Sequence, residues 1–375
     1  MRLCNGGHCK TTCVWPVPLT NLNRMSESAA TQRILRVRRD YNSWVATETM
    51  EDYALRFAPR SFRKWSEARV AATALGSISF LALEAIGGAV MVSYGFTNAV
   101  CAIVAVALVI FLTGLPISYY AARFNVDIDL LARGAGFGYL GSTITSLIYA
   151  SFTFIFFAIE AAIMALMFQL YFDWPLAFGY LASSLAIIPF VLHGITRLSK
   201  LQLWTFVPWV VLAVLPFACV LHKDPSLFQA WTTFGGYSPG GTQFDPLLFG
   251  AATTVCFSLI AQIGEQVDFL RFMPERGEHN RRRWWAAVIC AGPGWVVPGL
   301  LKQLAGTFLA FLVIQQQLPP YRAEDPTLMY VVGFSYVFDS PKLALAAATV
   351  FVLLSQLKIN VTNAYAGSLA WSNFF

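Results

Sequence analysis

Eight long apolar stretches constrain the fold of this chain more than any other feature. They cover approximately residues 69–94, 98–122, 138–169, 175–194, 203–222, 245–270, 285–314 and 342–368. A helix of about 20 apolar residues is long enough to cross the hydrocarbon core of a bilayer. Backbone polar groups in lipid must be satisfied internally, which favours helices. The sequence therefore predicts an all-α integral membrane protein with about eight spans.

The composition supports this class and argues against others. Hydrophobic residues make up 57% of the chain and charged residues only 12%, whereas soluble domains carry about 25% charged residues. The net charge of +6 fits loops beside a membrane, so we expect a lipid bilayer as partner and no nucleic acid. A cluster of His8 with Cys4, Cys9 and Cys13 fits no standard zinc spacing. The sequence holds no nucleophile–base set and no metal signature, so we expect no enzyme, no catalytic or metal-binding residue and no cofactor.

Basic residues between the spans predict the orientation. With the N-terminus inside, the inner connections hold nine basic residues and the outer connections three. The inner set is Arg123, Arg133, Arg197, Lys200, Arg271, Arg276, Arg281, Arg282 and Arg283, and the outer set is Lys223, Arg322 and Lys342. Cytoplasmic loops carry the excess of Lys and Arg. We therefore expect a multi-pass protein of the cell (inner) membrane with a cytoplasmic N-terminus.

The chain divides into a polar, basic tail over residues 1–67 and a transmembrane domain over residues 68–375. Residues 1–24 also fit a mis-assigned start, because Met25 offers an alternative one. The last span ends close to Phe375, so we expect the transmembrane domain to be incomplete at its C-terminus.

Carboxylates inside the apolar stretches are the first sign of a functional site, because a charge at the bilayer centre costs ~2.5–3.5 kcal/mol on insertion scales. Glu84 lies in the first span, three residues before the pair Gly87 and Gly88. We expect a helix break at this pair, with Glu84 binding a cation or carrying a proton. The alternative is that the glycines allow close helix packing while Glu84 bonds to a neighbouring helix.

The third span carries Phe156 and Glu160, four residues apart and therefore on one helix face. An aromatic ring beside a hydrogen-bonding carboxylate suits a flat heterocycle, because the ring stacks and the acid accepts its N–H groups. Ordinary helix packing would explain Phe156 equally well, but it would not explain Glu160.

The sixth span combines Gln262, Glu265 and Asp268 with Gly264, which weakens the helix there. Irregular backbone at membrane depth is tolerated where it lines a cavity. We expect a helix break at Gly264, with Gln262 and Glu265 facing a bound molecule. We expect Asp268 to form an ion pair with Arg271 at the inner interface.

The eighth span holds Lys358, Asn360 and Asn363 within six positions. Asn360 and Asn363 can share a helix face, and amides suit the edge of a base. In the seventh span, Lys302 follows Pro293, Gly294 and Pro298. Pairing of Lys302 with Glu84 or with Glu265 stays open.

Together these segments resemble the nucleobase–cation symporter family of purine, cytosine, uracil, allantoin and hydantoin permeases. Three motifs carry the likeness: the glycine-rich entry from Arg133 to Gly141, the end of span six from Gln266 to Arg271, and the pattern from Ser355 to Gly367. The tail segment from Glu51 to Pro59 is also similar, so the likeness runs from about residue 51 to the end of the chain.

The resemblance implies a leucine-transporter-type fold of two inverted five-helix repeats, with broken helices one and six and alternating access. Phe156 and Glu160 match the family's stacking and hydrogen-bonding positions, and Asn363 matches its span-eight asparagine. The expected function is secondary transport of a nucleobase or related heterocycle. The alternative is a sensory input module of a membrane histidine kinase whose kinase part is missing from this chain.

Two positions depart from the family pattern. Leu259 stands where a stacking tryptophan is common in span six, and Leu357 and Lys358 replace the small hydroxyl residues of the sodium site. Sodium coupling is therefore in doubt. Either the Lys358 ammonium replaces the ion permanently, or Lys358 carries a proton, which together with Glu84 would couple transport to H⁺.

Overall fold

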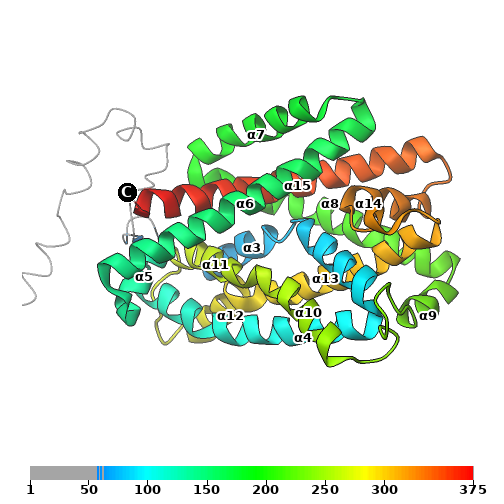
Figure 1. Cartoon of the computed structure of the whole chain (residues 1–375). Helices are drawn as coiled ribbons and strands as arrows, with labels where there is room; N and C mark the ends of the chain where they lie inside the picture. Colours follow the sequence, from blue (N-terminus) through cyan, green and yellow to red (C-terminus); the bar gives the residue numbers. More distant parts are fainter. Residues whose placement is uncertain (1–56, 59, 61–62, 375) are drawn as a thin grey trace, which may run out of the picture. The chain divides into compact units, whose positions relative to one another are not determined.

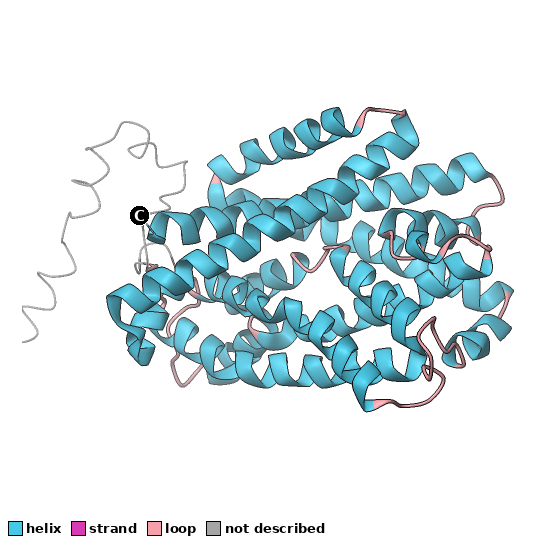
Figure 2. Ribbon diagram, viewed as in Figure 1, coloured by secondary structure: helices cyan, strands magenta, loops and turns pink. Residues whose placement is uncertain are grey.

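A computed structural model describes residues 57–58, 60 and 63–374, and nearly all of them are helical (Figure 2). Within this part of the chain the structure has no β-strand, and an isolated bridge joins Phe57 to Val126. Most of the tail, including Cys4, His8, Cys9 and Cys13, lies outside the described residues. The first described helix is α3, which begins at Glu67.

The helices follow the predicted apolar stretches closely (Figure 1). In chain order they are α3 (Glu67–Gly76), α4 (Ala82–Phe124), α5 (Ile128–Ala132), η2 (Arg133–Phe137), α6 (Gly138–Phe172), α7 (Leu176–Leu192), α8 (Gly194–Lys223), α9 (Ser226–Thr232), α10 (Pro246–Cys256), η3 (Phe257–Gln262), α11 (Ile263–Leu270), α12 (Arg281–Ala291), η4 (Pro293–Trp295), α13 (Val296–Gln315), η5 (Pro320–Arg322), α14 (Pro326–Ser335) and α15 (Pro341–Phe374). Six helical segments are long and apolar enough to span a membrane, and α7 and α14 are shorter apolar helices. The predicted all-α integral membrane class is confirmed.

The first two predicted spans are joined in α4 by a sharp bend at Gly95. Its φ of 79° and ψ of 169° are not helical. A side chain there would meet backbone, because a Cβ on Gly95 would lie 2.4 Å from the Gly241 carbonyl oxygen. The Phe96 N–H donates to the Phe234 carbonyl over 2.8 Å. The bend is therefore held against the loop that precedes α10.

The first span is broken, but before the glycine pair to which the sequence pointed. Helix α3 ends at Gly76, and α4 begins at Ala82 after five residues without regular helix. Gly87 and Gly88 lie inside α4, where a Cβ on Gly87 would come within 2.0 Å of the Gln303 carbonyl oxygen. These glycines allow α13 to pack closely on α4, so the packing alternative describes them and the predicted break does not.

The sixth span is also broken, over the 3₁₀ segment η3 between α10 and α11. Gly264 is the second residue of α11, and a Cβ there would lie 2.5 Å from the Tyr149 ring. Gly264 thus serves a close contact with α6 just beyond the break. A third break, at Gly292 and η4, divides the seventh span into α12 and α13.

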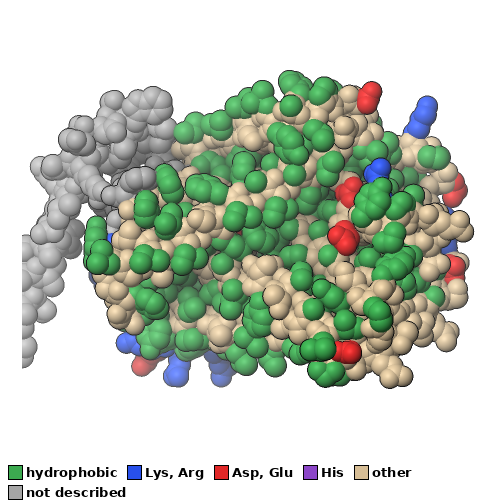
Figure 3. Space-filling model, viewed as in Figure 1, with side chains coloured by type: hydrophobic (Ala, Val, Ile, Leu, Met, Phe, Trp, Pro, Cys, Tyr) green, Lys and Arg blue, Asp and Glu red, His purple; other side chains and the backbone are tan. Residues whose placement is uncertain are grey.

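Two long helix pairs surround these breaks. Helices α6 and α15 run side by side (Figure 1), and α13 packs along α4. The visible face of the molecule carries few charged side chains among many hydrophobic ones (Figure 3). Exposed residues such as Leu108, Ile144 and Leu181 are apolar, as a surface that faces lipid must be.

Candidate functional site

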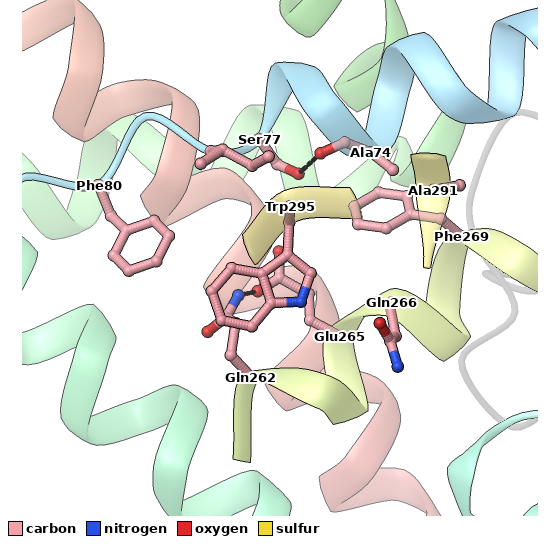
Figure 4. Close-up of a pocket in the computed structure, with 10 residues that line it drawn as sticks. Ala74, Ser77, Phe80, Gln262, Glu265, Gln266, Phe269, Ala291 and Trp295 are labelled. Carbon is pink, nitrogen blue, oxygen red and sulfur yellow. Dashed lines mark hydrogen bonds between the residues drawn. The ribbon is translucent and has the colours of Figure 1, made fainter. Parts of the chain in front are cut away.

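The broken ends of three spans meet around one pocket (Figure 4). The first span contributes the residues between α3 and α4, the sixth contributes the start of α11, and the seventh contributes η4. The lining residues are Ala74, Ser77, Ile78, Phe80, Gln262, Glu265, Gln266, Phe269, Ala291 and Trp295, and the space between them has a volume of about 20 Å³. This is room for about one water molecule, so the helices around the pocket must move apart before it can hold a small ring.

Two residues predicted from the sixth span line this pocket. Gln262 and Glu265 are both buried, and the Gln262 Nε2 donates to Glu265 Oε2. Their neighbour Gln266 donates to the Gly114 carbonyl over 3.3 Å, while its Oε1 has no hydrogen-bond partner among the described residues. The wall formed by the end of η3 and the start of α11 therefore presents a carboxylate and two amides to the pocket.

Trp295 lines the same pocket, although the sequence did not single it out. Its side chain is buried, and its Nε1 has no hydrogen-bond partner in the described part of the chain. A buried indole N–H group usually donates to a hydrogen-bond partner. The signal that could have found Trp295 is the run of Pro293, Gly294 and Pro298 around it, because these residues break the helix at mid-span.

Glu160 has a different role from the one predicted. Its Oε2 accepts the Leu81 N–H over 3.2 Å, and its Oε1 accepts the Ala82 N–H over 3.1 Å. These N–H groups open α4 and have no acceptor within their own helix. A carboxylate is favoured at a helix N-terminus. Glu160 therefore anchors the start of α4 to α6 instead of opening into the pocket.

Phe156 lies behind the pocket. Its ring meets Phe80 edge-on at 6.2 Å between centroids and meets Phe152 at 4.5 Å. Phe80 lines the pocket, whereas Phe156 does not. In this conformation Phe80 is the ring that faces the space, and Phe156 supports it.

Helix α15 presents a buried row of amides. Gln356, Asn360 and Asn363 follow one another at helical spacing and are at most 1% exposed. Both amide atoms of Gln356 and of Asn360, and Nδ2 of Asn363, have no hydrogen-bond partner within the residues described. Buried amides without partners cost free energy. The row, which includes the predicted Asn360 and Asn363, therefore holds polar atoms without partners in the described structure, and it does not line the pocket in Figure 4.

Lys302, the lysine of the seventh span, forms its ion pair with Glu84. Lys302 Nζ lies 2.6 Å from Glu84 Oε1, which also accepts the Tyr330 hydroxyl over 2.9 Å. The Lys302 ammonium is 5.3 Å from the centroid of the Trp209 ring. Glu84 is fully buried. The predicted coupling carboxylate thus belongs to a buried ion pair next to the break of the first span.

Lys358 is also fully buried, but it has no carboxylate partner in the part of the chain that the structure describes. Its Nζ donates to Thr205 Oγ1 over 2.9 Å and to the Gln202 carbonyl over 3.3 Å. Hydroxyl and carbonyl oxygens are also the ligands that hard cations choose. The ammonium therefore occupies a small oxygen-lined position between α8 and α15.

The ion pair predicted at the inner end of span six is not the contact that Asp268 makes. Asp268 Oδ2 accepts the Tyr149 hydroxyl over 3.0 Å. Arg271 donates from its NH2 group to the Tyr365 hydroxyl over 2.6 Å. Each residue thus joins α11 to a different long helix, α6 for Asp268 and α15 for Arg271. Two aromatic hydroxyls hold this end of the broken span.

The structure brings together Gln262 and Glu265 of the predicted binding residues and adds Phe80 and Trp295. It places Phe156 and Glu160 in a supporting layer and gives Asn360 and Asn363 a separate buried wall on α15. Among the described residues, no three His, Cys, Asp or Glu side chains gather closely enough to hold a metal ion.

In inverted-repeat membrane proteins, the substrate-binding site typically lies where transmembrane helices are interrupted. The pocket described above lies at such interruptions. The comparisons define the class: the chain has the leucine-transporter-type fold, as predicted. It aligns with the solved structure of Mhp1, a nucleobase-cation-symport-1 family transporter, in a closed conformation with bromovinylhydantoin bound.

The alignment with Mhp1 has a TM-score of 0.64 and covers 86% of this chain and 70% of that one. Only 15% of the aligned residues are identical, so the likeness is one of fold. No protein-family model matches the sequence, and no curated protein matches it.

Proposed function

We propose that the chain is a secondary active transporter of a nucleobase-like heterocycle, of purine, pyrimidine, allantoin or hydantoin type. The observation that carries the proposal is the pocket at the breaks of three spans. Phe80 and Trp295 offer aromatic rings, and Glu265 offers a carboxylate beside them. Rings stack on flat heterocycles, and carboxylates accept their N–H groups. Mhp1, which shares the fold, holds a hydantoin derivative.

The proposed roles follow from the contacts. Trp295 and Phe80 contact the faces of the ring, and Gln262 and Glu265 bond its edge. Their mutual hydrogen bond would open to admit the ligand. The amide of Asn360 and Nδ2 of Asn363 are buried without partners in the described structure but lie outside the lining of this pocket, so they would bond the ligand only after the helices move. Glu160 and Phe156 hold the first span in place and contact the ligand indirectly.

Transport would follow an alternating-access cycle in which one helix bundle rocks against the other around this site. The breaks divide the spans into halves that can move separately. We propose that the N-terminus is cytoplasmic and that the membrane is the cell (inner) membrane, on the strength of the basic residues between the spans.

Ligand binding is the direct test. Purified protein should be screened by thermal shift against nucleobases, allantoin and hydantoins, and any ligand that stabilises it should then be measured as radiolabelled uptake into proteoliposomes. We expect Trp295→Ala to weaken binding by about two- to thirteenfold through the loss of stacking alone, since an aromatic stacking contact contributes ~0.5–1.5 kcal/mol beyond its burial. Glu265→Gln should weaken it similarly.

Trp204→Ala is the matched control, because Trp204 is 84% exposed and should leave affinity unchanged. Wild-type affinity in Trp295→Ala would contradict the proposed site. Binding without any accumulation in proteoliposomes would contradict transport and favour the sensory alternative.

A further inference from the structure

A second hollow lies at the end of the molecule that carries the arginine-rich connection after α11. Four of its lining residues are arginines, Arg60, Arg63, Arg123 and Arg276, and we refer to it as the arginine pocket. Its volume is about 550 Å³, within the range of roughly 300–1,000 Å³ for ligand-sized pockets. It shares no lining residue with the pocket at the helix breaks.

The arginine pocket has more positive charge than its own residues neutralise. Glu275 is the carboxylate in its lining, with an oxygen 2.8 Å from Arg60 Nε and 3.6 Å from Arg63 NH1. Four guanidinium groups against one carboxylate leave an excess of three positive charges. Arg123 and Arg276 have no carboxylate partner within the described residues.

Aromatic rings hold the two unneutralised arginines in place. The Arg123 guanidinium lies 5.8 Å from the Tyr119 ring centroid and 5.7 Å from that of Phe124. The Arg276 guanidinium lies 5.6 Å from the Trp284 ring centroid. Contacts of this kind support a guanidinium through its face. Arg123 Nη1 also donates to the Tyr119 hydroxyl, and the remaining N–H groups of the two arginines are left for an anion.

The floor of the arginine pocket is built from buried, hydrogen-bonded groups. Asn125 is 4% exposed and donates to the Arg271 and Met273 carbonyls over 3.0 and 2.8 Å. Arg63 Nε donates to the Ala58 carbonyl over 2.9 Å. Burial lowers the pKa of Arg63 below its usual value, and the charge of Arg60 adds to the effect. A bound anion would relieve this crowding of charge.

The surroundings point to the level of the lipid headgroups. Tyr120 and Phe124 are 49% and 58% exposed, and their rings stack at 6.2 Å. Exposed aromatic residues are enriched where a membrane protein crosses the interface, and basic pockets beside spans bind phosphate headgroups. Arginine matches phosphate through paired N–H donors.

We propose that the arginine pocket binds the phosphate group of a net anionic ligand, of which an anionic phospholipid headgroup is the source that the flanking aromatic residues favour. This site is independent of the transport site. Arg123 and Arg276 make the principal contacts, while Glu275 keeps Arg60 and Arg63 oriented at the rim.

The test uses the full chain purified in detergent. Thermal unfolding is followed while phosphatidylglycerol, phosphatidylcholine or inorganic phosphate is titrated at constant ionic strength. We expect phosphatidylglycerol to stabilise the wild type at far lower concentration than phosphatidylcholine. Arg123→Gln with Arg276→Gln should raise the half-saturating concentration at least about tenfold, since a hydrogen bond to a charged group contributes ~1.5–3 kcal/mol.

The matched control is Arg282→Gln with Arg283→Gln, which removes two exposed arginines outside the pocket and should titrate like the wild type. Should the double variant at Arg123 and Arg276 fail to fold, Arg276→Gln alone provides the comparison. Saturation by inorganic phosphate, lost in the variant, would support the site with a soluble ligand. Equal responses of variant and wild type, or of the two lipids, would overturn the proposal.

Discussion

The stability of the protein depends on both members of one buried ion pair. Glu84 and Lys302 lie 2.6 Å apart between α4 and α13, and Tyr330 donates to the same carboxylate oxygen. Removing one partner of a buried pair leaves an uncompensated charge, which typically costs ~3–5 kcal/mol. Removing both partners leaves no uncompensated charge.

We therefore expect Lys302→Met to lower the free energy of unfolding by ~3–5 kcal/mol. Glu84→Gln should lower the free energy of unfolding by a similar amount, because it leaves the buried Lys302 ammonium without a carboxylate partner. The double variant should be more stable than either single variant. Denaturant unfolding in detergent, arranged as a double-mutant cycle, measures the coupling. Strictly additive effects would show that the pair is not coupled.

Asp127 gives the stability a pH dependence that can be isolated. It accepts the Leu130 N–H over 3.0 Å as the cap of α5, and its other oxygen accepts from Asn373 over 2.6 Å. Burial raises the pKa of Asp127 from 3.8 to about 6, although Leu130, Arg271 and Asn373 oppose the shift.

Because the raised pKa belongs to the folded state, the folded protein binds more protons than the unfolded chain between about pH 4 and pH 6. The free energy of unfolding must therefore fall as the pH rises through this window, by up to ~3 kcal/mol from this group. Asp127→Asn keeps a capping oxygen but does not titrate. Unfolding of wild type and variant between pH 4 and pH 7 should show a shallower slope in the variant, and identical slopes would contradict the assignment.

At the scale of the elements, the crossing of α4 and α13 depends on small residues from both helices. A Cβ on Gly306 would lie 2.2 Å from the Glu84 carbonyl oxygen, just as one on Gly87 would meet the Gln303 backbone. Backbone cannot yield as a flexible side chain does, and overpacking typically costs ~1–3 kcal/mol.

Gly306→Ala should accordingly destabilise the protein by ~1–3 kcal/mol, measured as a lowered unfolding midpoint in detergent. Gly134→Ala is the matched control, because nothing lies within 4 Å of a Cβ at that position. We expect the control to change stability by no more than ~0.5 kcal/mol. A neutral Gly306→Ala would mean that the two helices can separate without cost.

At the scale of the whole molecule, the proposed transport cycle requires a coupling ion. Lys358 holds a buried position lined by Thr205 Oγ1 and the Gln202 carbonyl. We propose that its ammonium stands in place of a coupling cation or moves a proton. Lys358→Ala should then reduce uptake at least about tenfold, as the loss of one charged hydrogen bond would, and alter its dependence on sodium or on a pH gradient.

Uptake into proteoliposomes with sodium and pH gradients imposed separately distinguishes these cases. Lys342→Ala removes an exposed lysine from the start of the same helix and should leave uptake unchanged. If Lys358→Ala retains both the wild-type rate and the wild-type ion dependence, Lys358 has no part in coupling.

The parts of the fold that the sequence predicted are those set by local chemistry. Helix α6 and helix α15 fall almost on the predicted stretches because apolar length alone specifies a span. Charged residues within the spans stand out in the sequence because a charge inside the bilayer costs free energy. The first span breaks between α3 and α4, before the glycine pair at which the sequence predicts the break. A glycine pair is equally compatible with a helix break and with a close helix contact.

The site was only partly predictable, because its members come from spans far apart in the chain. Gln262 and Glu265 line the pocket from the sixth span, and Trp295 reaches it from a third broken span. Glu160 is satisfied by backbone N–H groups of α4, and only the packing of α6 against the first span shows this.

Apolar length and composition are enough to specify a helical membrane protein with charged and amide groups inside its spans, since burial in lipid restricts both composition and backbone. The roles of those groups follow from their contacts in the folded chain. Glu84 pairs with Lys302, Glu160 anchors a half-helix, and Lys358 rests on neutral oxygens. The physical reason is that a buried polar group takes its role from the partner that compensates its loss of water, and that partner is supplied by another helix.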